Sequence, residues 1–587
     1  MSIISSLTPT QISALTTTQI KDLTTQDVKA LSNKQINALT STQIAAIETQ
    51  DLVILSGKQI SAFKPNEFTY GMTTAQIQAI TSTQAKGLTA AQLKDMNSGN
   101  LSSLSTDALS ALSAKQIQGL NSTNIESLTT AQAAALSYKQ IAAISLDAVK
   151  GFETADLAKI DATAIKGLTA AQLGALGSEQ FNSLNSSQVQ ALSAKQIQAL
   201  GTDVIESLTT SDMEEFSAAQ VAALSSAQLG TLTSDKLDAL STEALGALSA
   251  KQIQGLDEAN LSTGTISALT AKQIAALTTV QLNGMDSNQI GAISTDGIAS
   301  LTAAQVKGLS SANITALTTA QAEDLSAKQI AGISTDAVKG FETADLATIG
   351  TAAIKGLTAA QLGALGSEQF NSLNSSQVQA LSAKQIQALG TDVISSLTTS
   401  DMKEFSATQV AALSNAQLGK LSSGQLSALS TDALGALSAK QIQGLDATKL
   451  STNVISALSA KQIAALTVDQ LNTMDISAIS TGSIASLTAA QVKGLSSANI
   501  TALTTAQAEA LSAKQIAGIS TDAVKGLETA DLAQISTAAI KGLTADQIET
   551  FSTGQVKALT SDQVQALSAK QIQAFTTEQI QHLNFGS

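Results

Sequence analysis

The sequence contains no cysteine, no tryptophan, two prolines and one histidine, and all 32 of its basic residues are lysine. Without cysteine the chain can form neither disulfides nor thiolate metal sites. Aromatic residues are only 2% of the 587 residues, so any core must be thin and aliphatic. The net charge is −14, and without arginine the chain lacks the planar fork that binds phosphates and base edges. We therefore expect no nucleic-acid partner.

Long apolar segments are also missing. The opening residues, MSIISSLTPTQ, lack the basic and apolar regions of a secretory signal peptide. The longest apolar runs, such as residues 52–55, are far too short to cross a bilayer. We expect no membrane insertion, and either a soluble chain or one exported without an N-terminal signal.

An eight-residue repeat organises nearly the whole chain, from Leu7 to Leu583. Its consensus is L-[ST]-x-x-Q-[IV]-x-[AG], and we number the octad from its leucine. Ser or Thr at position 2 and Gln at position 5 have the spacing of a capping box, in which each side chain satisfies the backbone N–H of the other residue. The leucine before the cap and the Ile at position 6 have the spacing of a hydrophobic staple. Each octad thus carries the signals of a helix start.

The period of eight excludes a continuous helix. A helix advances about 100° per residue, so an eight-residue stripe would rotate by roughly 80° per repeat. A continuous strand fails as well, because positions 1 and 6 are an odd number of residues apart and would lie on opposite faces. We predict an all-α solenoid of very short helices, one per eight-residue repeat, each of about five to seven residues. Small residues at position 8 are expected to let the chain turn.

The phase slips in four places. Phe63 to Met72 spans nine residues, Leu256 to Leu269 and Leu445 to Leu458 span thirteen each, and Met474 to Ile479 spans five. We expect a bulge or turn at each slip within one uninterrupted array. The predicted organisation is a solenoid over residues 1–63, an irregular connection at 64–71, and a solenoid over 72–587.

A longer repeat overlies the octads, because the segment from Leu168 returns at Leu357, 189 residues later, and in part from Leu543, 186 residues after that. Residues 168–232 and 357–421 differ at five places, all at octad positions 3, 4, 7 or 8. We therefore infer that positions 1, 2, 5 and 6 have structural roles and that positions 3, 4 and 7 are exposed to solvent.

No residue pattern indicates catalysis, a cofactor or a metal, so we expect no enzyme and assign no catalytic, cofactor-binding or metal-binding residue. His582 has no partner for a triad or a metal site. Acids at position 5 are interpreted as helix caps: Asp27, Asp51, Asp156, Asp212, Asp345 and Asp531. The Ser-Thr-Asp triplets at 105–107, 294–296 and 334–336 lack the loop motifs of calcium sites. Methionines at positions 1 and 6 are predicted to lie in the core.

The composition resembles that of bacterial surface-layer, filament and repetitive adhesin proteins: rich in Ala, Ser, Thr and Gln, with lysine as the base and few aromatics. The resemblance covers the whole chain and implies a structural role outside the cell or on its surface, with the cytoplasm as the alternative location. A second resemblance, of residues 301–309 (LTAAQVKGL) to the start of a TAL-effector repeat, covers one helix start only.

We expect a self-assembling extracellular filament, sheath or surface layer; an adhesin stalk or a partner-binding α-solenoid scaffold are the alternatives. The chain itself is the expected partner, with cell-surface glycans or lipids as further partners to consider. The first octad, from Leu7, and the final ones, from Leu567 and Phe575, keep the ordinary apolar pattern rather than a polar cap. Uncapped ends predict head-to-tail contacts between residues 1–16 and 567–587.

Overall fold

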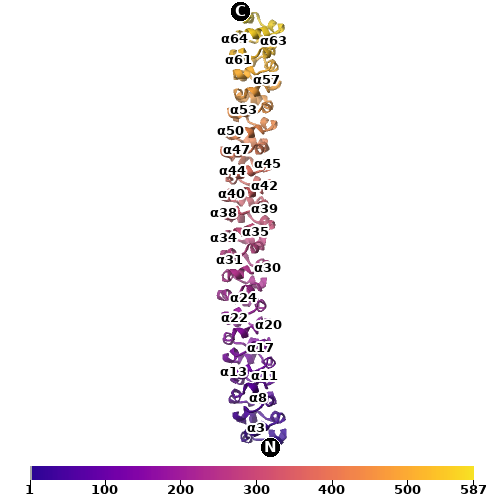
Figure 1. Cartoon of the computed structure of the whole chain (residues 1–587), viewed down its shortest axis with the longest axis vertical. Helices are drawn as coiled ribbons and strands as arrows, with labels where there is room; N and C mark the ends of the chain where they lie inside the picture. Colours follow the sequence, from indigo (N-terminus) through magenta and orange to yellow (C-terminus); the bar gives the residue numbers. More distant parts are fainter. Residues whose placement is uncertain (1–2, 587) are drawn as a thin grey trace. The chain divides into compact units, whose positions relative to one another are not determined.

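The computed structural model describes residues 3–586, and the chain divides into two compact units, residues 1–297 and 298–587. The described residues contain 67 α-helices and seven short 3-10 helices, and no strand. The α-helices are four to seven residues long. Figure 1 draws them as short coiled ribbons that follow one another along the chain. The prediction of an all-α solenoid with one very short helix per octad is confirmed. Residues 1, 2 and 587, which belong to the predicted head-to-tail contacts, lie outside the described residues.

The capping box starts the helices as predicted. In α14 (Ala114–Ile117) the Ser113 N–H donates to Gln116 Oε1 at 2.8 Å, and the Gln116 N–H donates to Ser113 Oγ at 3.4 Å. Two backbone donors of the helix start are thereby satisfied. The helix ends after one or two turns because positions 1 and 2 of the next octad leave the helical region, as at Leu31 (φ −60°, ψ 125°) and Ser32 (φ −73°, ψ 157°).

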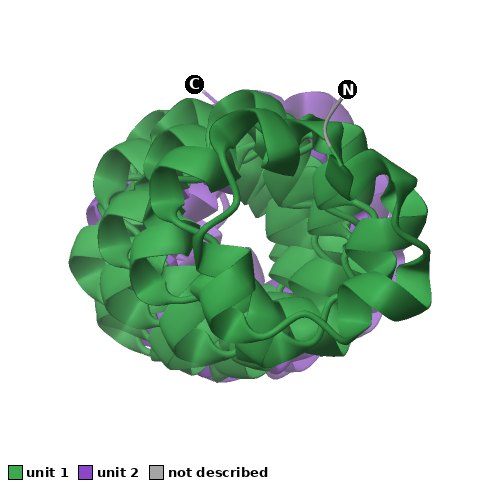
Figure 2. Cartoon of the chain, turned by 90° about the horizontal axis from the view of Figure 1, so that it is seen from below, with its two compact units in different colours: residues 1–297 green, residues 298–587 purple. Residues whose placement is uncertain are grey.

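Turns of the solenoid stack on one another within each unit. In the first unit α1 (Pro9–Ser13) packs against α4 (Asn33–Ala38), and in the second α45 (Ala383–Gln387) packs against α48 (Ala407–Ala412). Seen end-on in Figure 2, the helices of the first unit follow one another around a common axis. The leucines of position 1 and the Ile or Val of position 6 are buried along this stack, for example Ile117 at 0% and Leu120 at 2% exposure. The core is thin and aliphatic, as the composition predicts.

The glutamine of position 5 also joins successive turns, through a second use of its side chain. The Gln132 Nε2 group donates to the carbonyl oxygens of Leu101 (2.8 Å) and Leu104 (2.7 Å), which lie 31 and 28 residues earlier. In the second unit Gln377 Nε2 donates to Leu346 O and Ile349 O at 2.7 and 2.6 Å, with the same separations. We call this series of bonds the amide ladder. One turn of the solenoid therefore takes between three and four octads.

The small residue at position 8 has a different role from the one predicted. The chain turns through the extended residues at positions 1 and 2, and the single positive φ among the described residues is at Gly586. Position 8 instead passes close to position 3 of the preceding turn: a Cβ on Gly119 would lie 2.7 Å from the Cβ of Ala90, and one on Gly151 would press into the carbonyl oxygen of Ser122. Stacking, rather than turning, requires a small residue there.

The stretch 64–71, predicted to be irregular, is instead the helix α8 (Pro65–Gly71). Pro65 occupies its first turn, where a missing N–H costs nothing. Phe68 is fully buried, and its ring lies 6.0 Å from that of Phe63. The prediction was wrong because this segment lacks the consensus residues of the octad. Its helix begins at a proline instead of a Ser or Thr cap, and its core residue is phenylalanine instead of Ile or Val.

The other slips each contain a five-residue element, here called a pentad, at residues 256–260, 445–449 and 474–478. Each pentad forms a three-residue 3-10 helix: η3 (Glu258–Asn260), η5 (Ala447–Lys449) and η6 (Ile476–Ala478). An aspartate precedes each 3-10 helix and accepts a hydrogen bond from the N–H two residues later.

The amide ladder continues across every slip. Gln273, beyond the first pentad, donates to Leu245 O and Leu248 O, 28 and 25 residues earlier. The partners are still position 6 and position 1 of the preceding turn, so a pentad shortens one turn by three residues and leaves the pairing intact. Gln76, beyond the nine-residue slip, likewise keeps its two partners at 32 and 29 residues.

Candidate functional site

Some departures from glutamine at position 5 keep a hydrogen-bond donor directed at the preceding turn, whereas those to Ala, Val or Asp do not. Asn124 Nδ2 donates to Met96 O at 3.2 Å, and Lys236 Nζ donates to Glu206 O. Asp27 and Asp212 instead form the capping box with Thr at position 2, as predicted, through bonds such as Thr209 N–H to Asp212 Oδ2 at 2.7 Å, and Asp401 does the same. Their position-5 carboxylates have no donor for the carbonyl oxygens of the preceding turn.

Four octads depart from the consensus in a second way, and we call them the Glu–Asp octads. They have Glu at position 2 together with Asp at position 5: residues 47–54, 152–159, 341–348 and 527–534. The glutamates are the N-caps of α6 (Thr49–Leu52), α18 (Thr154–Leu157), α40 (Thr343–Thr348) and α61 (Thr529–Gln534), and none makes a side-chain cap bond. Asp51, Asp156, Asp345 and Asp531 lie in the first turn of these helices, as predicted, but they form no reciprocal capping box, because their position-2 partner has no hydroxyl.

The aspartates of these octads are buried: Asp51 is 4% exposed, Asp156 and Asp345 1% and Asp531 3%. One carboxylate oxygen accepts a bond from a threonine of the preceding turn, as in Thr505 Oγ1 to Asp531 Oδ1 at 2.9 Å. The other oxygen, Oδ2, is buried without a hydrogen-bond partner in Asp156, Asp345 and Asp531. A buried acceptor without a partner is costly, so these three positions need a physical explanation.

The charge of these groups is affected by their surroundings. Burial raises the pKa of Asp156 and of Asp345 above the ordinary value of 3.8, hydrogen bonds from Thr130 and Thr319 oppose the shift, and the negative charges of Glu153 and Glu342 add to it. The three ion pairs between described side chains join Lys150 to Asp147, Lys339 to Asp336 and Lys525 to Asp522. None of these lysines is paired with a buried aspartate.

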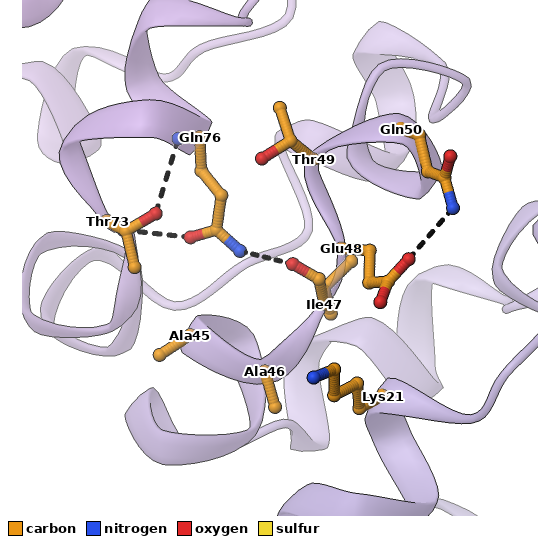
Figure 3. A pocket seen from close by; sticks show the side chains of 9 residues that line it. All are labelled: Lys21, Ala45, Ala46, Ile47, Glu48, Thr49, Gln50, Thr73 and Gln76. Atoms are coloured by element: carbon orange, nitrogen blue, oxygen red, sulfur yellow. Dashed lines mark hydrogen bonds between the residues drawn. The ribbon is translucent and has the colours of Figure 1, made fainter.

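Two of the position-2 glutamates, Glu48 and Glu528, line polar hollows at the corners between octads. Figure 3 shows the hollow beside Glu48, which Lys21 of the preceding turn and Thr73 and Gln76 of the next turn also line. An equivalent hollow beside Glu528 is lined by Thr501, Ser552 and Gln555 at corresponding positions. These hollows hold no arrangement of nucleophile and base, and no described cluster has three or more His, Asp or Glu side chains placed to hold a metal ion.

The other residues singled out from the sequence lie in ordinary structural places. His582 is half-buried, and the methionines of positions 1 and 6 are buried in the core as predicted. The Ser-Thr-Asp triplets start helical segments, as Ser105 does for α13 (Thr106–Ser110). The longest described helix has seven residues, and none has the length and apolar character needed to span a bilayer.

Sequence reasoning missed the Glu–Asp octads as a group. It sorted the aspartates by position 5 alone, where all of them resemble helix caps. The available signal was the pairing, since Glu occurs at position 2 only where position 5 is one of the four buried aspartates.

The eight-residue period and its capping signals match a known family model, the ALTTAQ repeat, over more than half of the chain. This chain belongs to the ALTTAQ repeat family. The matched segments are residues 20–56, 149–186, 205–242, 282–319, 338–375, 394–431, 410–448, 471–505, 524–561 and 553–584.

No protein of curated function matches the chain. Among solved structures, a leucine-rich repeat-containing protein, LegL7 from Legionella pneumophila, is similar at 12% identity, over 46% of this chain and 79% of that one, with a TM-score of 0.11. A TM-score this low is not that of a shared fold, so the solenoid assignment rests on the helices and hydrogen bonds of this chain.

Proposed function

We propose that this ALTTAQ repeat chain is a non-enzymatic structural protein that self-associates, end to end, into an extracellular filament, sheath or surface layer. A repeat protein with solenoid-like architecture fits a structural or scaffold role. Self-association is supported by one observation in particular: turns with Gln at position 5 present amide donors on one side and carbonyl acceptors on the other. Such a surface is complementary to itself but not symmetric, and repeated asymmetric contacts give open chains of subunits.

The terminal turns of this polypeptide carry these groups without partners. Gln11 and Gln19 form their capping boxes, but their Nε2 groups donate to no described residue, and both side chains are exposed. Leu7 and Leu15 are half-buried, whereas the position-1 leucines of the following turns are buried. At the opposite end Ile580 is 43% exposed. A turn of a second copy stacked on these surfaces would accept from the free amides and cover the exposed apolar side chains.

The test is sedimentation velocity and electron microscopy of the 587-residue chain across concentration. We expect oligomers whose length grows with concentration. Gln11→Glu with Gln19→Glu should abolish them, because Glu keeps the acceptor of the capping box but replaces the free donor with a carboxylate facing carbonyl oxygens.

The matched control is Gln118→Glu with Gln254→Glu, which adds the same charge at exposed position-7 residues and should leave assembly unchanged. A chain that stays monomeric at high concentration across varied salt, calcium and pH would contradict the proposal. Equal loss of assembly in both variants would also contradict it, because general charge repulsion would then explain the result.

A further inference from the structure

Three of the Glu–Asp octads hold a buried carboxylate that the chain itself does not neutralise. Asp156, Asp345 and Asp531 are 1%, 1% and 3% exposed, and the Oδ2 atom of each has no hydrogen-bond partner. No described lysine is paired with any of them. The threonine hydroxyl that donates to the other oxygen, as Thr505 does to Asp531, fixes the orientation of the carboxylate.

The backbone carbonyl oxygen at the corresponding place in the preceding turn also receives no hydrogen bond. In a consensus octad the Gln amide donates to the carbonyl oxygen of the leucine 28 residues earlier, as Gln132 does to Leu104. The corresponding leucines for the three aspartates are Leu128, Leu317 and Leu503, and no described group donates to their carbonyl oxygens. The threonine hydroxyl serves Oδ1 of the aspartate, so replacing the amide by a carboxylate leaves Oδ2 and the leucine carbonyl oxygen, two acceptors, without a donor.

The glutamate at position 2 adds a second negative charge to the same helix start. Glu153 and Glu342 act electrostatically on Asp156 and Asp345. A proton on the aspartate would relieve one of the two charges, whereas a divalent cation would relieve both. Two carboxylates with backbone carbonyl oxygens, completed by water, form the oxygen-only ligand set that Ca²⁺ takes, while Mg²⁺ demands a stricter octahedron and retains more of its water.

We propose that the octads 152–159, 341–348 and 527–534 are cation sites of the calcium type, each binding one divalent ion between successive turns of the solenoid. The ligands are Oδ2 of the buried aspartate, the carboxylate of the position-2 glutamate and the carbonyl oxygen of the leucine one turn earlier. The bound ion would replace the missing amide, joining two turns through their oxygen atoms. This proposal does not depend on self-association, because each site lies within one unit of one chain.

The experiment is calcium titration of the full-length chain after treatment with EDTA, by calorimetry and by equilibrium dialysis, followed by thermal unfolding. We expect about three ions per chain, one per site of the stated ligand chemistry, and a higher unfolding temperature with CaCl₂ than with EDTA. MgCl₂ at the same concentration and NaCl at the same ionic strength should give much smaller increases.

The decisive variant converts all three octads to the consensus, with Thr for Glu153, Glu342 and Glu528 and Gln for Asp156, Asp345 and Asp531. It restores the capping box and the amide ladder, so it should fold and, in EDTA, unfold at a higher temperature than the wild type. It should bind none of the three ions and should not respond to calcium. The control, Asp212→Gln with Asp401→Gln, changes aspartates that already form capping boxes and should keep all three sites.

Three results would overturn the proposal. The first is equal calcium binding, or none, in the wild type and the consensus variant. The second is an equal effect of MgCl₂ or NaCl, which would indicate screening of the net charge. The third is a wild type that is stabilised by acid but not by calcium, because a proton would then occupy the place assigned to the ion.

Discussion

A single glutamine side chain performs two tasks in the consensus octad. Its Oε1 atom accepts from the cap N–H within its own helix, and its Nε2 atom donates to two carbonyl oxygens of the preceding turn, as Gln132 shows. Neither Glu nor Asp can replace both functions when ionised, because a carboxylate is an acceptor only. Retention of Gln in most octads follows from this double requirement rather than from helix propensity.

At this scale we predict that Gln132→Glu destabilises the protein by about 1–3 kcal/mol at neutral pH, because a charged acceptor then faces two carbonyl oxygens. The capping box itself should survive. Chemical denaturation monitored by circular dichroism measures the change, with the exposed Gln118→Glu as the control of equal charge. The loss should shrink in acid, where protonation of the introduced carboxylate restores a donor; a loss independent of pH would show that the charge is not its cause.

The buried aspartates give a second prediction, for solutions without divalent ions. Because the folded-state pKa values of Asp156 and Asp345 are raised above 3.8, their protonated forms favour the folded state below that pH, and this contribution is lost as the pH rises through the raised values. Relative to a variant with Thr for Glu153 and Glu342 and Gln for Asp156 and Asp345, the wild type should lose stability between acidic and neutral pH. Denaturation midpoints in EDTA over this range measure the difference, and a constant difference would contradict the prediction.

At the scale of the element, the sequence predicts the helix and its start but not the contacts between turns. The capping box and staple are local, since all their residues lie within one octad, and the structure confirms the capping box at residues such as Ser113 and Gln116. The amide ladder joins residues 28 and 31 apart, and no local pattern states which carbonyl oxygens a Gln will reach. For the same reason a small residue such as Gly151 suggests a turn in the sequence, whereas the structure shows its close approach to Ser122.

This close approach leads to a third prediction. Gly151→Ala should destabilise the chain by roughly 1–3 kcal/mol, because the new Cβ would press into the Ser122 carbonyl and force the two turns apart. Gly246→Ala is the matched control, since nothing lies within 4 Å of its added Cβ. It should be neutral or stabilising by up to about 1 kcal/mol, as alanine favours the helix over glycine. Equal effects of the two substitutions on the denaturation midpoint would show that contact between turns is not what keeps position 8 small.

At the scale of the whole molecule, we expect the array to tolerate the loss of a whole element, such as a pentad, better than the loss of part of an octad. A fourth prediction is that deletion of the pentad 256–260 leaves a folded protein with nearly unchanged helical signal, because the octads on either side then follow one another directly. Deletion of five residues within an octad, 249–253, removes a cap, a ladder glutamine and a core isoleucine together and should lower the unfolding temperature much more. Circular dichroism and thermal unfolding compare the two variants, and similar losses would show that pentads are not interchangeable elements of the array.

The pentads also affect how such a chain can change through inheritance. The long repeat begins at Leu168 and returns at Leu357 and Leu543, after intervals of 189 and 186 residues. The second interval contains two pentads and the first contains one. A pentad forms one helical element, as an octad does, but has three residues fewer. Both intervals therefore contain the same number of helical elements. Unequal recombination between the matching DNA segments would therefore add or remove a fixed number of stacked helices and restore every ladder bond at the junction. A gene of this kind can lengthen or shorten its product in large steps without passing through a misfolded intermediate.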